Sequence, residues 1–389
     1  KFKDLVKSEK KVVLAGRIIS IRLQGGSCFL HFVDESGKLQ AFLRKDNLGE
    51  DKFKDFKNNF DQGDFVEFTG TAFETKTKEE SILVSDIKIL SKTLMPLPDE
   101  YYGLKDTDLR YRKRYLDLLV NPEVKKIFDL RSKIFKFIRD YFDKQGFTEV
   151  DTPILQSVAG GATAQPFITH HKALDIDLYL RVAPELYLKR LIIGGYEKVY
   201  EMARCFRNEG IDHQHNPEFT QIEFYWAYKD YEFLMSFMEK FIAALVKEVN
   251  NGKLKVKNGK DTIDFTPPYP RIDFKEALDK ALKIDIDKTN DKQLADLAKT
   301  AKLPVDKTWG RGKLLDELYK KYVRQDIIQP SFLINHPLEL SPLSKKIPDR
   351  PNYVERFQLL VKTAEVCNAF SELNDPIDQE QRFKEQKKL

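Results

Sequence analysis

The chain has 389 residues, of which 41% are hydrophobic and 33% charged, a composition that fits a globular protein of two or three domains. No stretch approaches the roughly 18 apolar residues that a membrane-spanning helix needs, and no signal-peptide pattern follows Lys1. The net charge of +5 permits a polyanionic partner but does not demand one, because a lysine-rich solvated surface gives the same value. The three cysteines are scattered without a CxxC pair, which argues against a disulfide framework and a zinc site and indicates a reducing cytoplasm.

Residues 1–95 carry the pattern of a small β-barrel. Five strand-like runs are separated by turn signals, and they cover residues 12–21, 27–34, 39–43, 64–73 and 81–90. A helix is predicted over residues 51–60, between the third and fourth runs. Five strands with a helix after the third is the order of an OB-fold, which often binds single-stranded nucleic acid by stacking bases on aromatic rings.

The candidate nucleic-acid surface of this barrel combines aromatic and polar side chains of its first three strands: Arg17, Phe29, His31, Phe32 and Gln40. Strand alternation puts Phe29 and His31 on one face and Phe32 on the other, so only part of the set can be exposed. For any one phenylalanine, burial in the barrel core is the commoner outcome.

Residues 96–120 are predicted to form a connector, because Pro96, Pro98 and Gly103 interrupt any regular element. A basic patch in it either contacts a nucleic-acid backbone or forms a solvated helix face, and we favour the solvated face. The patch consists of Arg110, Arg112, Lys113 and Arg114. Beyond residue 120, the spacing of apolar residues predicts an amphipathic helix over 123–145, which Gly146 ends, and a short strand over 147–150.

Two segments between residues 155 and 190 have compositions that suit ligand binding. Residues 160–164, GGATA, lack both the GxxxxGK[ST] and the GxGxxG phosphate patterns, but their small side chains let the backbone approach a ligand closely. A strand follows, and then a helix that begins at Pro184 with Glu185 in its first turn. Glu185 has an ordinary explanation there, since an acidic side chain stabilises a helix N-terminus.

Residues 198–228 contain two runs of period two around a polar loop, which predicts a long antiparallel hairpin. One face of the second run is apolar, with Thr220, Ile222, Phe224 and Trp226. The other face could form the floor of a binding site for a polar cationic ligand, and it carries Phe219, Gln221, Glu223 and Tyr225. Arg207 ends the first run, where its planar fork could grip a phosphate. Polar side chains crowd the loop: Glu209, His213, His215, Asn216 and Glu218. On residue types alone, a solvated hairpin is an equally good interpretation.

The rest of the chain combines helices with two strand regions. A helix is predicted over 231–250, and the lysine-rich region 251–330 is interpreted as a helical insertion, with helices over 274–283, 291–302 and 312–324. Residues 331–343 return to a strand, in which His336 is interpreted as structural. In residues 363–376, TAEVCNAFSELNDP, alternation places Asn368, Phe370 and Glu372 on one strand face and Glu365 on the other.

The hairpin resembles motif 2 of the class II aminoacyl-tRNA synthetases, through Arg207-Asn208-Glu209 and the later HNPEFT. The run RVAPELYLKRLIIGGYEKVYEMARCFRNEGI is similar to the lysyl-tRNA synthetases in particular, as are TAEVCNAFSELNDP and the barrel segments AGRIISIR and SCFLHFVDESGKLQ. GFTEVDTPIL and the helix before it resemble motif 1, the dimer interface of the class. The resemblance covers most of the chain and implies an α+β fold: an OB-fold anticodon-binding domain over 1–95, a connector over 96–120, and a class II catalytic domain over 121–389 whose antiparallel sheet is flanked by helices.

The resemblance implies an enzyme that activates L-lysine with ATP and passes the lysyl group to tRNA(Lys). It implies a lysine site made of Gly161, Glu185, Glu223, Tyr225, Asn368, Phe370 and Glu372. It implies an ATP site made of Arg207, Glu209, His215, Asn216, Phe219 and Glu365, with Arg207 as the catalytic residue. The ATP-bound Mg²⁺ is assigned to Glu365 and Glu372, which requires a bulge or a turn near Asn368. Anticodon contacts are assigned to Arg17, Phe29, Gln40 and Glu79.

One departure from the family pattern concerns motif 3, a glycine-rich strand and helix with an ATP-clamping arginine. It is expected a few dozen residues after ELNDP, and the printed sequence ends at Leu389 before such a segment. We interpret the sequence as a piece of a longer enzyme in preference to an inactive relative, and we expect weak or no adenylate formation from the piece alone. The alternatives are a non-catalytic RNA-binding relative and, less favoured because of the barrel, a paralogue that attaches lysine to a protein.

Overall fold

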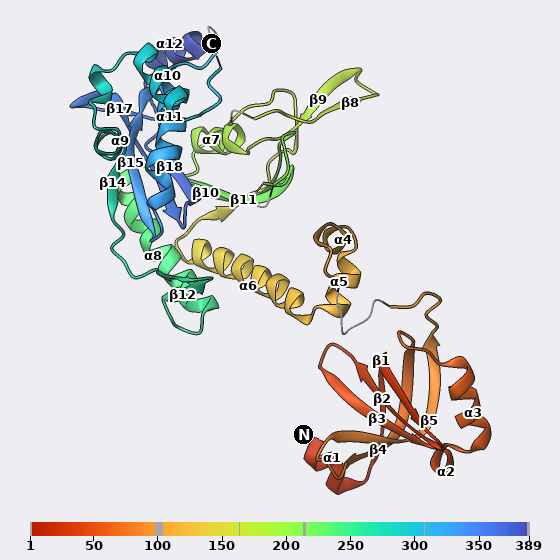
Figure 1. Ribbon diagram of the computed structural model, residues 1–389. Helices are drawn as coiled ribbons and strands as arrows, with labels where there is room; N and C mark the ends of the chain where they lie inside the picture. The colour runs from red at the N-terminus through yellow and green to blue at the C-terminus, as the bar shows by residue number, and fades with distance from the viewer. Residues whose placement is uncertain (1, 98–103, 163, 213–214, 307, 387–389) are drawn as a thin grey trace. The chain divides into compact units, whose positions relative to one another are not determined.

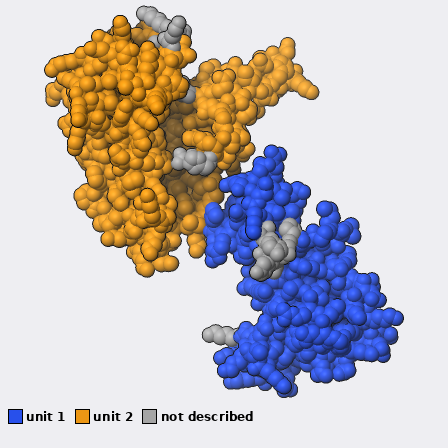
Figure 2. Space-filling model, in the orientation of Figure 1, with its two compact units in different colours: residues 1–128 blue, residues 129–389 orange. Residues whose placement is uncertain are grey.

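The computed structural model describes residues 2–97, 104–162, 164–212, 215–306 and 308–386 (Figure 1). The chain forms two compact units, residues 1–128 and residues 129–389, which Figure 2 colours separately. Unit 1 spans the predicted barrel, the whole predicted connector and the first residues of the helix after it, and unit 2 holds the two larger sheets. In the described ranges, no helix is long and apolar enough to cross a membrane.

Unit 1 is a closed five-stranded barrel of strand order β1-β2-β3-β5-β4, which confirms the predicted OB-fold. Its strands are β1 (Lys11–Gln24), β2 (Ser27–Val33), β3 (Lys38–Arg44), β4 (Phe65–Glu74) and β5 (Glu80–Ser91). Its helices are α1 (Phe2–Ser8), α2 (Lys45–Leu48) and α3 (Glu50–Asn59). Alternate residues of β2 are fully or almost fully buried, so Leu30 and Phe32 fill the core while Phe29 and His31 lie on the outer face.

Two short helices follow the barrel, α4 (Thr107–Arg112) and α5 (Arg114–Val120). The buried carboxylate of Asp117 accepts hydrogen bonds from Arg110 Nε at 2.8 Å and from Asn121 at 2.7 Å, and it also pairs with Arg114. Arg112 pairs with Asp108 at 2.8 Å. Much of the basic patch is thus neutralised by its own neighbours, which supports its interpretation as a helix face.

Unit 2 is built on two sheets that share one helical core. The first sheet has the order β11-β10-β6, with β6 (Thr148–Glu149), β10 (Lys198–Phe206) and β11 (Glu218–Trp226). The second has the order β14-β15-β17-β16 with β18 beside β17, and comprises β14 (Arg271–Asp273), β15 (Ser331–Pro337), β16 (Lys346–Ile347), β17 (Arg350–Val361) and β18 (Ala364–Phe370). The long helices α6 (Pro122–Lys144) and α8 (Tyr231–Val249) match their predicted ranges closely.

The shared core explains why the polar faces of the two sheets come together. Phe142 of α6 and Phe237 of α8 pack in one apolar cluster with Phe224 of β11 and with Phe357 of β17. Each sheet therefore turns its apolar face to the same helices, and strand alternation points the remaining side chains the other way.

A third, smaller sheet and one helix complete the surroundings of the polar faces. The sheet is β7-β9-β8, formed by β7 (Leu155–Gln156), β8 (Ile168–His171) and β9 (Ile176–Leu180). Helix α7 (Glu185–Ile193) follows, with Pro184 at its N-cap. Helix α12 (Pro376–Gln386) closes the part of the chain that the structure describes.

The region 251–330 is less uniformly helical than predicted. It contains the expected helices α9 (Phe274–Leu282), α10 (Asp291–Thr300) and α11 (Arg311–Tyr322), which pack around their own core with Leu278, Leu318 and Leu360. It also contains the hairpin of β12 (Lys255–Asn258) and β13 (Asp261–Asp264), and the strand β14, which pairs in parallel with β15. These strands have three or four residues, too few for strand alternation to show in the sequence.

Candidate active site

The predicted hairpin is present as β10 and β11, paired in regular antiparallel register from Lys198 opposite Trp226 to Phe206 opposite Glu218. Ile222, Phe224 and Trp226 join the apolar cluster under the sheet, as predicted for the core face. The opposite face carries Glu223 and the side chains around it, and it is this face that forms the floor of the candidate site.

Glu223 is a half-buried carboxylate held between its two neighbours on the same face of β11. Tyr225 Oη donates a hydrogen bond to one carboxylate oxygen at 3.0 Å, and Gln221 Nε2 donates to the other at 2.9 Å. Burial and the nearby Glu185 carboxylate raise the pKa of Glu223 to about 7. A carboxyl with this pKa gains its charge most readily when a cation binds beside it.

Helix α7 brings Glu185 to the same place. Glu185 is the first residue of the helix and is buried, at 7% exposure. Gly161 packs against it with φ of +89°, and a Cβ at that glycine would lie only 2.9 Å from Glu185 Cβ. Glycine is therefore required at 161 both by the backbone conformation and by the close approach to Glu185.

The end of β18 and the residues after it complete the site, because Phe370 and Glu372 meet Lys189 of α7 there. Lys189 Nζ lies 2.6 Å from Glu185 Oε1 and 2.8 Å from Glu372 Oε2, and 5.9 Å from the ring centres of Tyr225 and Phe370. Burial raises the pKa of Glu372 to about 7, although Lys189 acts against this rise. Burial lowers the pKa of Lys189, but Glu372 and Glu185 outweigh this and hold it above its ordinary value.

The structure thus brings together most of the residues assigned to lysine binding. They form one polar cluster about the Lys189 ammonium group, which we call the pocket: Gly161, Glu185, Glu223, Tyr225, Phe370 and Glu372. Asn368 lies on the same face of β18 as Phe370, where its Oδ1 accepts a hydrogen bond from Arg356 Nε at 2.8 Å. Sequence reasoning missed Lys189, although its position one helical turn after Glu185 on α7 was a visible signal.

A buried ion pair supports the floor of the pocket and was also missed. Arg181 NH1 lies 2.6 Å from Glu201 Oε1, and each side chain is only 3% exposed. Thr152 Oγ1 donates to the other oxygen of Glu201 at 2.7 Å, and Arg181 Nε donates to the Arg204 carbonyl at 2.8 Å. Glu201 stands opposite Glu223 in the hairpin register, so this network fixes the strand beside Glu223.

The candidate phosphate grip lies at the other end of the hairpin. The backbone N–H of Arg207 donates to the Pro217 carbonyl at 2.8 Å, which closes the hairpin loop, and its guanidinium carbon lies 5.0 Å from the centre of the Phe219 ring. Among the residues that the structure describes, Arg207 Nε is buried without a hydrogen-bond partner. A buried guanidinium N–H that still lacks an acceptor is well suited to an anionic ligand.

The loop residues assigned to ATP are more open to solvent. His215 is 72% exposed and its Nδ1 lies 2.8 Å from Asp212 Oδ2, while Glu209 and Asn216 are also exposed. His213, which sequence reasoning placed in the same loop, lies outside the described residues.

Glu365 occupies a different setting from Glu372. A β-bulge in β18 pairs Cys367 with Leu359 but Glu365 with Leu360, so Glu365 shares the face of Asn368 although it has the opposite parity in the sequence. Gln358 Nε2 donates to Glu365 Oε2 at 2.7 Å, whereas Glu372 pairs with Lys189.

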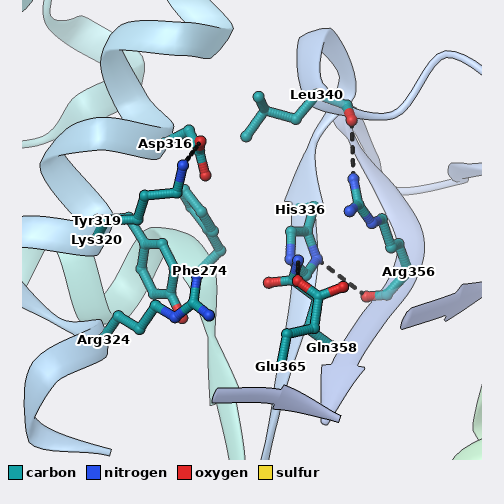
Figure 3. A pocket seen from close by; sticks show the side chains of 10 residues that line it. All are labelled: Phe274, Asp316, Tyr319, Lys320, Arg324, His336, Leu340, Arg356, Gln358 and Glu365. Atoms are coloured by element: carbon teal, nitrogen blue, oxygen red, sulfur yellow. Dashed lines mark hydrogen bonds and ion pairs between the residues drawn. The ribbon is translucent and has the colours of Figure 1, made fainter. Parts of the chain in front are cut away.

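Glu365 lines a polar cavity of about 300 Å³ between the second sheet and α11 (Figure 3). Burial raises the pKa of Glu365, and Arg356 opposes the rise. The imidazole of His336 is buried there, and burial lowers its pKa to about 3, so it is neutral at physiological pH. The described part of the chain has no cluster of three or more acidic, histidine or cysteine side chains that could hold a metal ion.

The residues assigned to anticodon binding lie in unit 1. Phe29 stacks on Phe42 with ring centres 4.2 Å apart, and Glu79 Oε1 accepts a hydrogen bond from His31 Nε2 at 2.9 Å. Gln40 is buried and bonded to Ser81 at 2.8 Å. The Arg17 guanidinium lies 4.3 Å from the centre of the Phe65 ring. Phe42 was missed, although it follows Gln40 by two residues and therefore shares its strand face.

Comparison with known proteins identifies the class of the chain. The family model for class II tRNA synthetases of the D, K and N type matches residues 106–389, and the model for the OB-fold nucleic acid binding domain matches residues 12–90. These matches agree with the described barrel and with the pocket on the polar faces of unit 2. A class II tRNA synthetase with an OB-fold domain is therefore the class that fold and site define.

Curated relatives show which family of the class II tRNA synthetases the chain is most similar to among those compared. The chain is 50% identical over 382 residues to a lysine--tRNA ligase of Clostridium perfringens, which covers 97% of this chain and 76% of the relative. It is 48% identical to a lysine--tRNA ligase of Syntrophomonas wolfei, with 96% and 76% covered, and 47% identical to one of Listeria monocytogenes, with 100% and 79% covered. The chain belongs to the lysyl-tRNA synthetase family of the class II tRNA synthetases.

Proposed function

We propose that the protein is a lysine–tRNA ligase, which activates L-lysine with ATP and transfers the lysyl group to tRNA(Lys). The observation that carries the proposal is the pocket in which Glu185, Glu223 and Glu372 surround an ammonium group. An amine with a long aliphatic stem, flanked by Tyr225 and Phe370, is the ligand that such a pocket selects.

In this proposal each end of the amino acid has its own partners. Glu185 and the backbone at Gly161 hold the α-amino group, and Glu223, Tyr225 and Glu372 hold the side-chain ammonium. Phe370 and Asn368 line the space between them. In this proposal the lysine carboxylate points toward Arg207, which directly follows β10 at the loop end of the hairpin that carries Glu223.

The chemical step requires little covalent chemistry from the protein. A carboxylate oxygen of lysine attacks the α-phosphorus of ATP, the bond to the β-phosphate oxygen breaks, and pyrophosphate leaves. Arg207 neutralises charge on the α-phosphate, and Phe219 stacks on the adenine beside Glu209. His215 and Asn216 hold the outer phosphates from the exposed loop.

ATP is proposed to enter with its Mg²⁺. Glu365 suits this ion as one hard oxygen ligand in a polar cavity, with phosphate oxygens and water as the others. Glu372 was assigned to the same ion, but its observed partner is Lys189, so we keep it with the lysine pocket.

We propose that the barrel binds the anticodon of the tRNA. Phe29 would stack an anticodon base, and Arg17, Gln40 and Glu79 would contact base edges. A homodimer through α6 and the strand after it follows from the motif 1 resemblance, and the cytoplasm is the compartment proposed for the reaction. The non-catalytic alternative is not favoured, because the acidic pocket and Arg207 are both in place.

Lysine-dependent ATP–pyrophosphate exchange by the full-length gene product tests the proposal. Glu223→Gln is expected to lower this exchange by well over tenfold, because the neutral amide cannot compensate the buried ammonium charge. Glu232→Gln, at an exposed position of α8, is the matched control and should leave the rate unchanged. Unchanged exchange in Glu223→Gln would remove Glu223 from the lysine pocket.

A further inference from the structure

Lys189 places the chain's own ammonium group among the carboxylates proposed to hold the substrate. Its Nζ contacts Glu185 at 2.6 Å and Glu372 at 2.8 Å, and the rings of Tyr225 and Phe370 flank it. Only 24% of the Lys189 side chain is exposed. It thus pairs with one carboxylate proposed for the α-amino group of the substrate, Glu185, and with one proposed for its side-chain ammonium, Glu372.

An ordinary helix ion pair does not explain this arrangement. Lys313 and Glu317 on α11 show the ordinary case, a pair one turn apart at 2.8 Å with 48% of the lysine exposed. Lys189 also lies one turn from its helix partner, but it reaches a second carboxylate on another element, Glu372. Two charge-assisted bonds in a partly dry pocket hold a side chain far more firmly than one exposed pair does.

We propose that Lys189 is an internal stand-in for the substrate ammonium, which neutralises the free pocket and is displaced when L-lysine binds. The inference rests on the proposed function. Among the described residues, Lys189 is the cation that contacts Glu185 and Glu372, so without it these two carboxylates and Glu223 would lie near one another uncompensated. The α-amino group of any amino acid can take over Glu185, but only a ligand with a side-chain cation can also take over Glu372, so Lys189 acts as a specificity determinant against amino acids of similar shape with a neutral side chain.

The displacement should weaken the apparent affinity for L-lysine. When only a fraction of the molecules have the pocket open, the apparent dissociation constant rises by the inverse of that fraction. Replacement of Lys189 by methionine keeps the aliphatic stem and removes the competing charge. Lys189→Met is therefore expected to bind L-lysine about tenfold more tightly, a factor that corresponds to an open fraction of about one tenth in the wild type.

Calorimetric titration of the full-length protein with L-lysine tests this inference. Lys189→Arg, which keeps a cation in the pocket, should show no tightening. Lys313→Met removes a helix pair outside the site and should bind as the wild type does. L-norleucine, which has the same carbon chain and α-ammonium group but no side-chain ammonium, should gain less than L-lysine from Lys189→Met.

The possible outcomes separate the inference from the proposed function. A dissociation constant that is unchanged or higher in Lys189→Met would overturn the inference, because Lys189 would then only position Glu185 and Glu372. Equal tightening toward L-norleucine would also overturn it, since extra space would explain the gain. A wild-type protein that binds no L-lysine would refute the proposed function itself. If Lys189→Met does not fold, the comparison of Lys189→Arg with the wild type decides. Lys189→Arg keeps the cation and should bind L-lysine as the wild type does, and a tighter complex would overturn the inference.

Discussion

The charge state of the lysine pocket makes its ligand affinity depend on pH near neutrality. Burial, reinforced by the Glu185 carboxylate, raises the pKa of both Glu223 and Glu372 to about 7 in the free protein. The groups that face them are Tyr225, which donates to Glu223, Lys189, which opposes both shifts, and Glu201, which adds to the rise at Glu223. Below pH 7 these two carboxyls hold protons that an incoming ammonium group must expel.

The size of the effect follows from the ionised fraction. A carboxyl with a pKa of about 7 is roughly nine-tenths ionised at pH 8 and one-tenth at pH 6, so each such group changes the apparent affinity about tenfold over this range. Because the two groups share one pocket, their titrations are coupled. We therefore expect the dissociation constant for L-lysine to rise by at least about tenfold, and up to about a hundredfold, when the pH falls from 8 to 6.

Isothermal titration at pH 6, 7 and 8 and constant ionic strength measures this rise. Repeating the titration in buffers of different ionisation enthalpy counts the protons released, and about one or two are expected near pH 6.5. Glu223→Gln should lose the share of the slope that Glu223 contributes. A dissociation constant that changes less than about twofold between pH 6 and 8, with no proton release, would refute the assignment of a raised pKa to both carboxyls.

Two further substitutions test the support of the pocket and the barrel. Arg181→Met leaves the Glu201 carboxylate buried without its partner, and it should lower the free energy of unfolding, measured by urea denaturation, by roughly 3–5 kcal/mol. The control Arg204→Met breaks an exposed pair with Glu218 at 3.2 Å and should lower it by under about 1 kcal/mol. Equal losses in the two variants would contradict a special role of the buried pair. Phe29→Ala should lower kcat/KM for tRNA(Lys) aminoacylation by about tenfold and leave ATP–pyrophosphate exchange intact, because one base loses its stacking partner. The control is Val13→Ala, at an exposed position of the barrel, which should change neither rate. A fall in exchange that matches the fall in aminoacylation in Phe29→Ala would count against an anticodon role.

The elements with clear periodicity could be predicted from the sequence. The barrel strands, α6, α8 and the β10–β11 hairpin repeat apolar residues at the period of their structure over enough residues for the pattern to stand out. The two faces of β11 also followed from alternation alone, which is why Glu223 and Tyr225 were placed on the polar side and Phe224 on the core side.

The remaining features depend on distances that periodicity does not encode. Strand β14 has three residues and is defined by its pairing with β15, so its own sequence carries no alternation. The bulge in β18 changes which face Glu365 occupies, and a single extra residue of that kind cannot be located from parity. Lys189 looked like an ordinary helix residue, because its second partner, Glu372, reaches it only through the packing of two sheets on one core.

That packing also explains how a pocket with three carboxylates can remain stable without its ligand. Lys189 offsets one negative charge, and the raised pKa values of Glu223 and Glu372 let protons offset part of the rest at neutral pH. A bound lysine replaces these protons with a fixed positive charge, so the carboxylates become fully ionised only in the complex. Selection then depends on charge that the ligand must supply. An amino acid of the same shape with a neutral side chain would leave the protons on Glu223 and Glu372 in place, and beyond its α-amino contact it would gain only the contacts with Tyr225 and Phe370.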